Sequence, residues 1–241
     1  MKKLFYIAAV ALLTLGMVSC HKDDDNTNNN TNTNTPTNPT NPTTGELVDL
    51  GLPSGLQWYS VNIGAAAPEL YGDYYAWGET ATKETYNWST YRYATVDANG
   101  DLQTLTKYNT SDTYGTIDNK TTLEASDDVA TAVLGSGARI PTKAEWQELL
   151  DNTTAEWTTQ NGVNGRKFTA ANGSSLFLPA AGLRNGSSLD GGGACGSYRS
   201  SSLIESSPDI ALSVDFASGY QGVTGGSRDC GQSVRAVRSQ N

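Results

Sequence analysis

The residues best equipped for chemistry stand near the start of the chain, in the stretch Cys20-His21-Lys22-Asp23-Asp24-Asp25. A thiol, an imidazole and several carboxyl groups so close together could ligate a metal ion. His21 is also the only histidine among the 241 residues. These soft and hard ligands would, however, follow one another on an unfolded segment, which is not preorganised for any one metal. We therefore expect no metal site here and a different role for the stretch.

The preceding residues, 1–19, have the layout of a secretory signal peptide. Two lysines are followed by a nearly continuous apolar run over 4–15, and small or apolar residues lead to Cys20. The run is too short to remain as a membrane-spanning helix. The junction Met17-Val18-Ser19-Cys20 resembles a bacterial lipobox, whose cysteine is acylated and becomes the first residue of the mature protein. The resemblance implies a lipid on Cys20 and attachment to the outer membrane.

The residues that follow Cys20 predict display at the cell surface. The run 22–25 is similar to the lysine-plus-acid signal of surface-exposed lipoproteins of the Bacteroides group; a solvated charge run without an address function is the alternative. Most of 20–45 is Asn, Thr and Pro, which cannot bury a core, so we expect a disordered tether. Signal, lipid and tether together predict an outer-membrane lipoprotein exposed at the cell surface.

Residues 46–241 are numerous enough for one domain with a substantial core. The chain is acidic, with a formal net charge of −9, which argues against nucleic acid as a partner. Cys195 and Cys230 are the only cysteines after Cys20, and an exported protein folds in an oxidising setting. We expect a disulfide between them, with two free cysteines as the alternative.

Hydrophobic periodicity and turn signals predict an α+β domain. A helix is expected over 141–150, where Thr142 and Glu145 form a capping box, and another over 126–134. Asn-Gly pairs predict hairpin turns at 161–165 and 172–173. Short strands are expected at 47–52, 56–62, 74–77, 155–160, 166–170, 174–178, 211–216 and 233–237. The first and last strands should meet in one sheet.

Several segments resemble, in the same order, those of the Fibrobacter succinogenes major paralogous domain, which is common in exported Bacteroides lipoproteins. They are DLGLPSGLQW (49–58), YGDYYAWGE (71–79), RIPTKAEW (139–146), LPAAG (178–182) and SVRAVR (233–238), and the similarity covers nearly all of 47–238. That family in turn resembles the C-type lectin-like fold, which formylglycine-generating enzymes share. The resemblance implies short antiparallel sheets, two helices and long loops able to present a binding surface, and by itself no reaction.

Catalytic patterns are incomplete in the expected domain. Formylglycine-generating enzymes use a close pair of cysteines, whereas Cys195 and Cys230 are far apart in the sequence. Without a histidine in the domain there is no Ser-His or Cys-His nucleophile pair. Asp73 and Glu79 could be imagined as the acid and base of a glycosidase, but any acidic surface offers such pairs. We therefore expect no enzyme activity, no catalytic residues and no cofactor.

The best candidates for ligand recognition lie in two C-terminal stretches that resemble polar loops, 198–202 and 219–229. Their content of Tyr, Ser, Gly and Arg is typical of binding loops. Our hypothesis is a ligand surface lined by Tyr198, Arg199, Tyr220, Gln221, Arg228 and Asp229. Ordinary polar loops over a structural core are the alternative. A further aromatic cluster could stack on sugar rings, but core packing is the favoured interpretation: Tyr71, Tyr74, Tyr75 and Trp77.

These features favour a surface-tethered binding module, an adhesin-like lipoprotein that recognises an extracellular glycan or protein. Retroelements diversify the C-terminal region of some lectin-like folds, and the same could hold for these stretches. A structural or tip component of a surface filament is the second possibility. A divergent enzyme of the formylglycine-generating type is the third.

Overall fold

The structure, a computed structural model, describes residues 45–240. The expected signal peptide, the lipid on Cys20 and nearly all of the tether lie outside the described residues. Within 45–240, no helix is long and apolar enough to cross a membrane.

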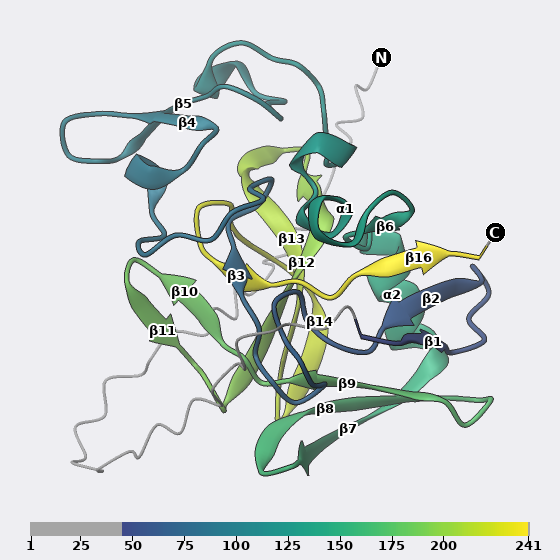
Figure 1. Cartoon of the computed structure of the whole chain (residues 1–241). Helices are drawn as coiled ribbons and strands as arrows, with labels where there is room; N and C mark the ends of the chain where they lie inside the picture. Colours follow the sequence, from purple (N-terminus) through teal and green to yellow (C-terminus); the bar gives the residue numbers. More distant parts are fainter. Residues whose placement is uncertain (1–44, 241) are drawn as a thin grey trace, which may run out of the picture.

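A five-stranded sheet forms the centre of the domain (Figure 1). Its strand order is β14-β13-β12-β15-β3, and all neighbours are antiparallel except β12 and β15, which are parallel. The strands are β3 (Tyr74–Tyr75), β12 (Cys195–Ile204), β13 (Ser207–Ala217), β14 (Tyr220–Ser227) and β15 (Gln232–Ser233).

A four-stranded antiparallel sheet joins the two ends of the described chain. Its order is β1-β2-β16-β6, from β1 (Leu47–Asp49), β2 (Leu56–Tyr59), β6 (Ala138–Arg139) and β16 (Val237–Ser239). Val237 lies opposite Trp58, and Figure 1 shows the yellow β16 beside the blue β2. The prediction that the first and last strands share a sheet is confirmed.

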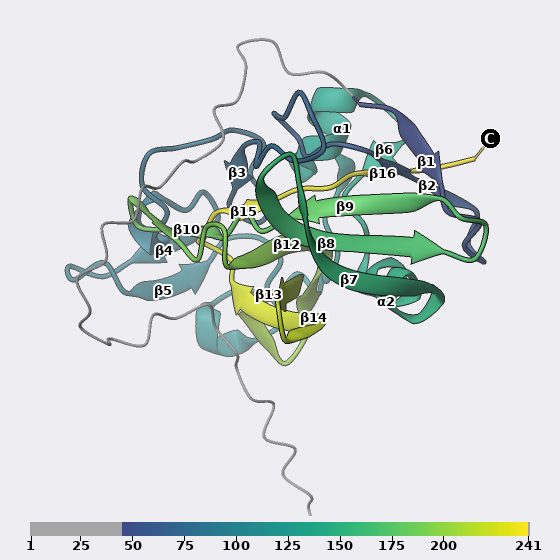
Figure 2. The same cartoon turned by 90° about the horizontal axis from the view of Figure 1, so that it is seen from below.

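Three smaller antiparallel units complete the sheet structure. A three-stranded sheet contains β7 (Thr153–Gln160), β8 (Val163–Ala170) and β9 (Ser175–Pro179), and Figure 2 shows it next to α2. Its first turn is tighter than expected, because Asn161 and Gly162 form it alone with φ of 48° and 83°. The two hairpins pair β4 (Ala94–Val96) with β5 (Leu102–Leu105) and β10 (Leu183–Asn185) with β11 (Ser188–Asp190).

The helical segments are short. The longest is α2 (Lys143–Asn152), where Thr142 Oγ1 accepts from the Glu145 amide and Glu145 Oε2 accepts from the Thr142 amide, so the predicted capping box is confirmed. The second predicted helix is shorter than expected: Asp128 caps α1 (Val129–Leu134), and the residues before it form a 3-10 turn, η3 (Ala125–Asp127). Two further 3-10 turns are η1 (Trp88–Thr90) and η2 (Asp112–Tyr114). The α+β class is confirmed at this level.

The main core lies among α2 and the three larger sheets. Trp146 of α2 contacts Trp58 of β2 with ring centroids 4.8 Å apart, and it also contacts Tyr198 of β12 at 6.2 Å. Tyr198 in turn stacks on Phe216 of β13. These rings bring one face of the five-stranded sheet against the helix.

A second core is rich in aromatic side chains, most of them from irregular segments. It contains Tyr71, Tyr74 and Trp77, and Tyr75 is buried in a neighbouring cluster. The hydroxyl of Tyr91 donates to the Trp77 carbonyl at 2.7 Å. The expected aromatic cluster therefore fills the interior. The Tyr91 hydroxyl packed against it satisfies a loop carbonyl.

Arg235 ties the segment after β2 to the C-terminal part of the chain. It is fully buried, and its Nε and Nη2 donate to Asn62 Oδ1 at 3.0 and 2.8 Å. Its Nη1 donates to the carbonyls of Tyr59 and Ser60. Burial lowers the pKa of Arg235 to about 10. The guanidinium thus supplies hydrogen-bond donors to backbone carbonyls at the end of β2.

We predict that Arg235→Ala lowers the free energy of unfolding by about 3 kcal/mol or more, because several buried acceptors lose their donor. Arg92→Ala removes an exposed arginine and should change it by less than about 0.5 kcal/mol. Urea unfolding followed by tryptophan fluorescence measures both. Equal effects of the two substitutions would contradict the role of Arg235.

Candidate functional site

Part of the expected binding surface belongs to the central strand β12. Tyr198 is fully buried, and its hydroxyl donates to the Pro179 carbonyl at 2.9 Å. Ser197, Ser200 and Ser201 are buried with it. The prediction of a loop over 198–202 is wrong, because pairing with β13 and β15 buries a stretch whose serines alone are typical of loops.

Arg199 is also an interior residue, with 1% of its surface exposed. Its Nη2 donates to the carbonyls of Ser227, Arg228 and Cys230 at 3.1, 3.4 and 2.5 Å. Burial lowers the pKa of this guanidinium. Arg199 therefore holds the segment after β14 against β12 and does not face a ligand from outside.

Arg228 fixes irregular segments from distant parts of the sequence. It is completely buried, and its Nε donates to Tyr91 Oη at 2.9 Å. Its Nη1 donates to the carbonyls of Tyr108 and Pro208 at 3.0 and 2.8 Å. The guanidinium carbon lies 4.8 Å from the centre of the Trp77 ring, a cation–π contact. A structural role accounts for all of these contacts.

The remaining members of the expected surface lie apart from one another. Asp229 is 7% exposed, accepts a hydrogen bond from Ser227 Oγ, and has a pKa raised by burial. Tyr220 and Gln221 are half-buried at the other end of β14. The hypothesis of one exposed surface is therefore wrong for Tyr198, Arg199, Arg228 and Asp229.

The expected disulfide is not formed, because Cys230 is a free, half-buried cysteine. Segment 182–184 pairs with both cysteine-containing stretches. The Gly182 amide donates to the Cys195 carbonyl at 2.7 Å, and Arg184 exchanges hydrogen bonds of 2.7 and 2.8 Å with Gly231. A disulfide would require the Cβ atoms of the two cysteines to approach within about 4.5 Å.

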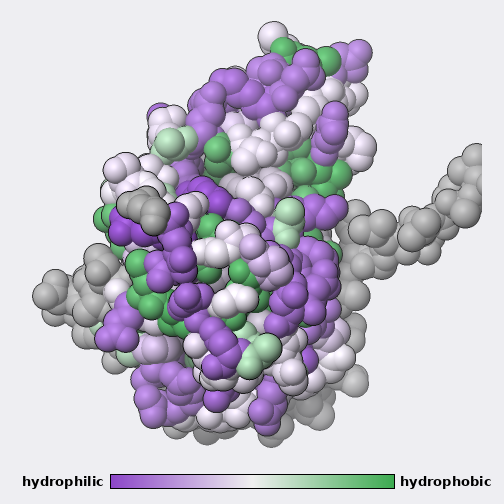
Figure 3. Space-filling view, turned by 90° about the vertical axis from the view of Figure 1, so that its right-hand side faces the viewer, coloured by the Kyte–Doolittle hydropathy of each residue, from purple (hydrophilic) through white to green (hydrophobic). Residues whose placement is uncertain are grey.

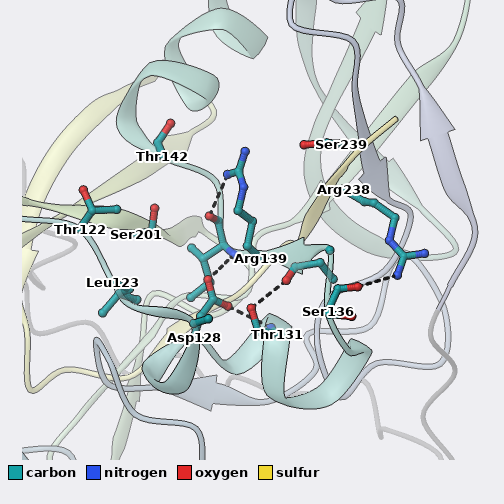
Figure 4. A pocket seen from close by; sticks show the side chains of 14 residues that line it. Thr122, Leu123, Asp128, Thr131, Ser136, Arg139, Thr142, Ser201, Arg238 and Ser239 are labelled. Carbon is teal, nitrogen blue, oxygen red and sulfur yellow. Dashed lines mark hydrogen bonds between the residues drawn. The ribbon is translucent and has the colours of Figure 1, made fainter. Parts of the chain in front are cut away.

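A pocket of about 710 Å³ lies around α1, β6 and β16, and Figure 4 shows its side chains. Its volume is typical of sites for small ligands. Hydroxyl groups are the most frequent feature of its walls. The lining residues are Thr122, Leu123, Ala125, Asp128, Thr131, Ser136, Gly137, Ala138, Arg139, Ile140, Thr142, Ser201, Arg238 and Ser239.

Asp128 lines this pocket, and 3% of its surface is exposed. Its Oδ1 accepts from the amides of Ala130 and Thr131 at 2.8 and 3.2 Å, and its Oδ2 accepts from the Ile140 amide at 2.8 Å. Burial raises the pKa of Asp128, although these amides oppose the shift. One carboxylate thus caps α1 and fastens the chain after β6 to it.

Two arginines bring positive charge to the pocket. Arg139 donates to both carboxylate oxygens of Glu145 at 2.6 and 2.5 Å, which raises the pKa of Arg139. Arg238 of β16 donates from Nη2 to the Ser136 carbonyl at 3.3 Å. Both side chains are half-buried.

Figure 3 shows the face that carries the C-terminal strand, where hydrophilic residues predominate and hydrophobic ones form small separate groups.

The chemistry available to the pocket is the binding of polar and anionic groups. It offers guanidinium and hydroxyl hydrogen-bond donors. Over 45–240 there is no group of His, Cys, Asp and Glu that could hold a metal ion. Elsewhere, Glu79, one of the two carboxylates imagined as a glycosidase pair, is bound by Lys83 at 2.9 Å and by the Arg92 amide at 2.7 Å.

No sequence pattern marked these residues as the lining of one pocket. Arg139 and Arg238 stood only within the motifs RIPTKAEW and SVRAVR. They meet because β6 pairs with β16 across about 100 intervening residues, with Arg238 opposite Ala138. No local pattern predicts such a pairing.

No family model matches the chain, and no curated protein or solved structure is significantly similar to it. The resemblance to the Fibrobacter succinogenes major paralogous domain therefore stays a prediction.

We predict that Cys230 reacts slowly with iodoacetamide in the native protein at pH 8, because burial raises the pKa of its thiol to about 11. Unfolding in urea without reductant should make it react rapidly. Peptide mapping by mass spectrometry identifies the alkylated residue. Recovery of a disulfide-linked peptide containing Cys195 and Cys230 would contradict the structure.

Asp127 lies in the segment that forms one wall of the pocket. Its contribution to the free energy of unfolding should depend on pH. Its Oδ2 accepts from Lys107 Nζ and Tyr108 Oη at 2.5 and 2.6 Å. Burial raises its pKa, but the hydrogen bonds from Lys107 and Tyr108 outweigh this and lower the pKa to about 2.

Because this folded-state pKa lies below the ordinary value of 3.8, Asp127 stabilises the fold above pH 4 and the stabilisation is lost as pH falls from about 4 to 2. Asp127→Asn should lower the free energy of unfolding at pH 7 by about 2 kcal/mol and flatten its dependence between about pH 4 and 2. Urea titrations across this range measure the change. The exposed Asp112→Asn is the control; an identical pH profile for both variants would contradict the assignment.

Proposed function

We propose that this protein is a surface-tethered lipoprotein whose folded domain binds an extracellular ligand through the pocket around α1, β6 and β16. The observation that carries the proposal is the convergence of hydroxyl groups and two guanidinium groups on a space of about 710 Å³. These groups are held by paired strands and a capped helix, a rigid support of the kind that binding sites require.

The N-terminal sequence supports presentation at the cell surface. A signal-like segment, a lipobox-like junction at Cys20 and an Asn, Thr and Pro-rich tether precede the domain. We further propose that the domain has a C-type lectin-like fold of the Fibrobacter succinogenes major paralogous type. Its short antiparallel sheets, two helices and long irregular segments are compatible with that fold.

A variant that fills the pocket tests this function. Ala125 is exposed and lines the pocket, whereas Ala132 of α1 is exposed and does not. Ala125→Trp should weaken binding to ligands found on a glycan and protein array by at least about tenfold, because the indole occupies the ligand's space. Ala132→Trp adds the same ring outside the pocket and should leave affinity unchanged. The affinities of both variants are measured with the full chain.

All array ligands that bind in the pocket should lose affinity for the Ala125→Trp variant. If every ligand bound the Ala125→Trp variant as well as the unsubstituted protein, the pocket would not be the binding site. If the array yielded no ligand at all, a structural role such as that of a filament component would become the better explanation.

A further inference from the structure

Two of the three charged side chains that line the pocket already have a protein partner. The Arg139 guanidinium forms a bidentate ion pair with Glu145. The Asp128 carboxylate accepts three backbone hydrogen bonds. Neither group therefore has its full charge available to a ligand.

Arg238 is the exception. The only hydrogen bond of its side chain within 45–240 is the 3.3 Å contact from Nη2 to the Ser136 carbonyl, and no carboxylate there forms an ion pair with it. Asp49 lies two strands away in the same sheet, where its carboxylate accepts from the Gly51 amide and from Gln240. Arg238 thus presents an uncompensated positive charge on a protein whose net charge is −9.

The position of Arg238 is restricted by the backbone of the neighbouring turn. A Cβ added to Gly137 would lie 3.5 Å from Arg238 Nε, so the guanidinium rests against this glycine. Gly137 has a φ of +94°, which favours glycine there. Nη1 and Nε of Arg238 make no hydrogen bond within 45–240, so both can donate to a ligand.

The rest of the lining suits a ligand rich in hydroxyl groups. The walls contribute many side-chain hydroxyls and few apolar groups larger than alanine, namely Leu123 and Ile140. Thr131 uses its hydroxyl to bond the Ala138 carbonyl. The hydroxyls of Ser136 and Ser239, on either side of Arg238, make no hydrogen bond within the described chain and are both on exposed residues. They can bond a ligand as donors or acceptors.

We propose that the pocket binds a carboxylated sugar, whose carboxylate is held by Arg238 and whose hydroxyls bond the serine and threonine side chains. This inference rests on the proposed function and names its ligand class. A guanidinium matches a carboxylate in geometry and charge. An acidic peptide would supply the same carboxylate, but the abundance of hydroxyl groups in the lining favours a saccharide.

The test titrates the full chain with galacturonate, glucuronate and N-acetylneuraminate, each against its methyl ester, by ligand-observed NMR. The ester keeps the sugar hydroxyls and removes the charge. At least one free acid should bind, and its ester should bind about tenfold or more weakly, the effect expected for a charge-assisted hydrogen bond. The peptide Glu-Glu serves as the peptide probe and should bind more weakly than the best sugar acid.

Arg238→Gln should weaken binding of that sugar acid by about tenfold or more and abolish its preference over the ester. Arg92→Gln makes the same change of charge at an exposed arginine outside the pocket and should have no effect. Circular dichroism checks that both variants are folded, and the acid–ester comparison with the unsubstituted protein holds even if one is not.

Failure of this inference is distinct from failure of the proposed function. It is overturned if no sugar acid binds, if the esters bind equally well, if Arg238→Gln binds like the unsubstituted protein, or if Glu-Glu binds more tightly. Array ligands that remain sensitive to Ala125→Trp in those cases would preserve the pocket as a binding site and reject only a carboxylated sugar.

Discussion

Three buried arginines hold together the parts of the domain that regular secondary structure does not. Arg199, Arg228 and Arg235 are at most 1% exposed, and none forms an ion pair with another residue of 45–240. They donate mainly to backbone carbonyls in irregular segments and near the ends of strands. A buried carbonyl without a donor costs about 1–3 kcal/mol, and a planar guanidinium can reach several carbonyls at once. Long irregular segments can therefore be buried in this fold.

The same constraint explains why polar residues are poor markers of the surface in this chain. In β12, serines flank the adjacent Tyr198 and Arg199, and neighbouring strands bury nearly all of them. The rings of Tyr198 and Phe216 fill one side of the sheet, while Ser197 donates to Asp215 on the other. Polar side chains such as Ser197 and Arg199 remain inside because they are bonded to other segments, so their presence here reflects internal bonding.

Compensation of charge within the fold also determines what the pocket can offer to a ligand. Asp128 is consumed in capping α1 and fastening the chain after β6, and Arg139 is consumed in the ion pair that orders the start of α2. Pairing of β16 with β6 then brings Arg238 to the same place, where no carboxylate of 45–240 forms an ion pair with it. The elements that build the pocket thereby leave one cation available, and binding an anion there would complete the electrostatic balance.

The sequence by itself determined the features that depend on neighbouring residues. Thr142 and Glu145 specify the start of α2, Asn161-Gly162 specifies a hairpin, and the alternation of short strands with helices specifies the α+β class. Tertiary structure alone decided that the polar stretch containing Tyr198 and Arg199 is a buried strand, that Cys230 stays free, and that Arg139 and Arg238 share a pocket. The physical reason is the range of the interactions: caps and turns close over a few residues, whereas burial and charge compensation depend on pairing between segments far apart in the chain.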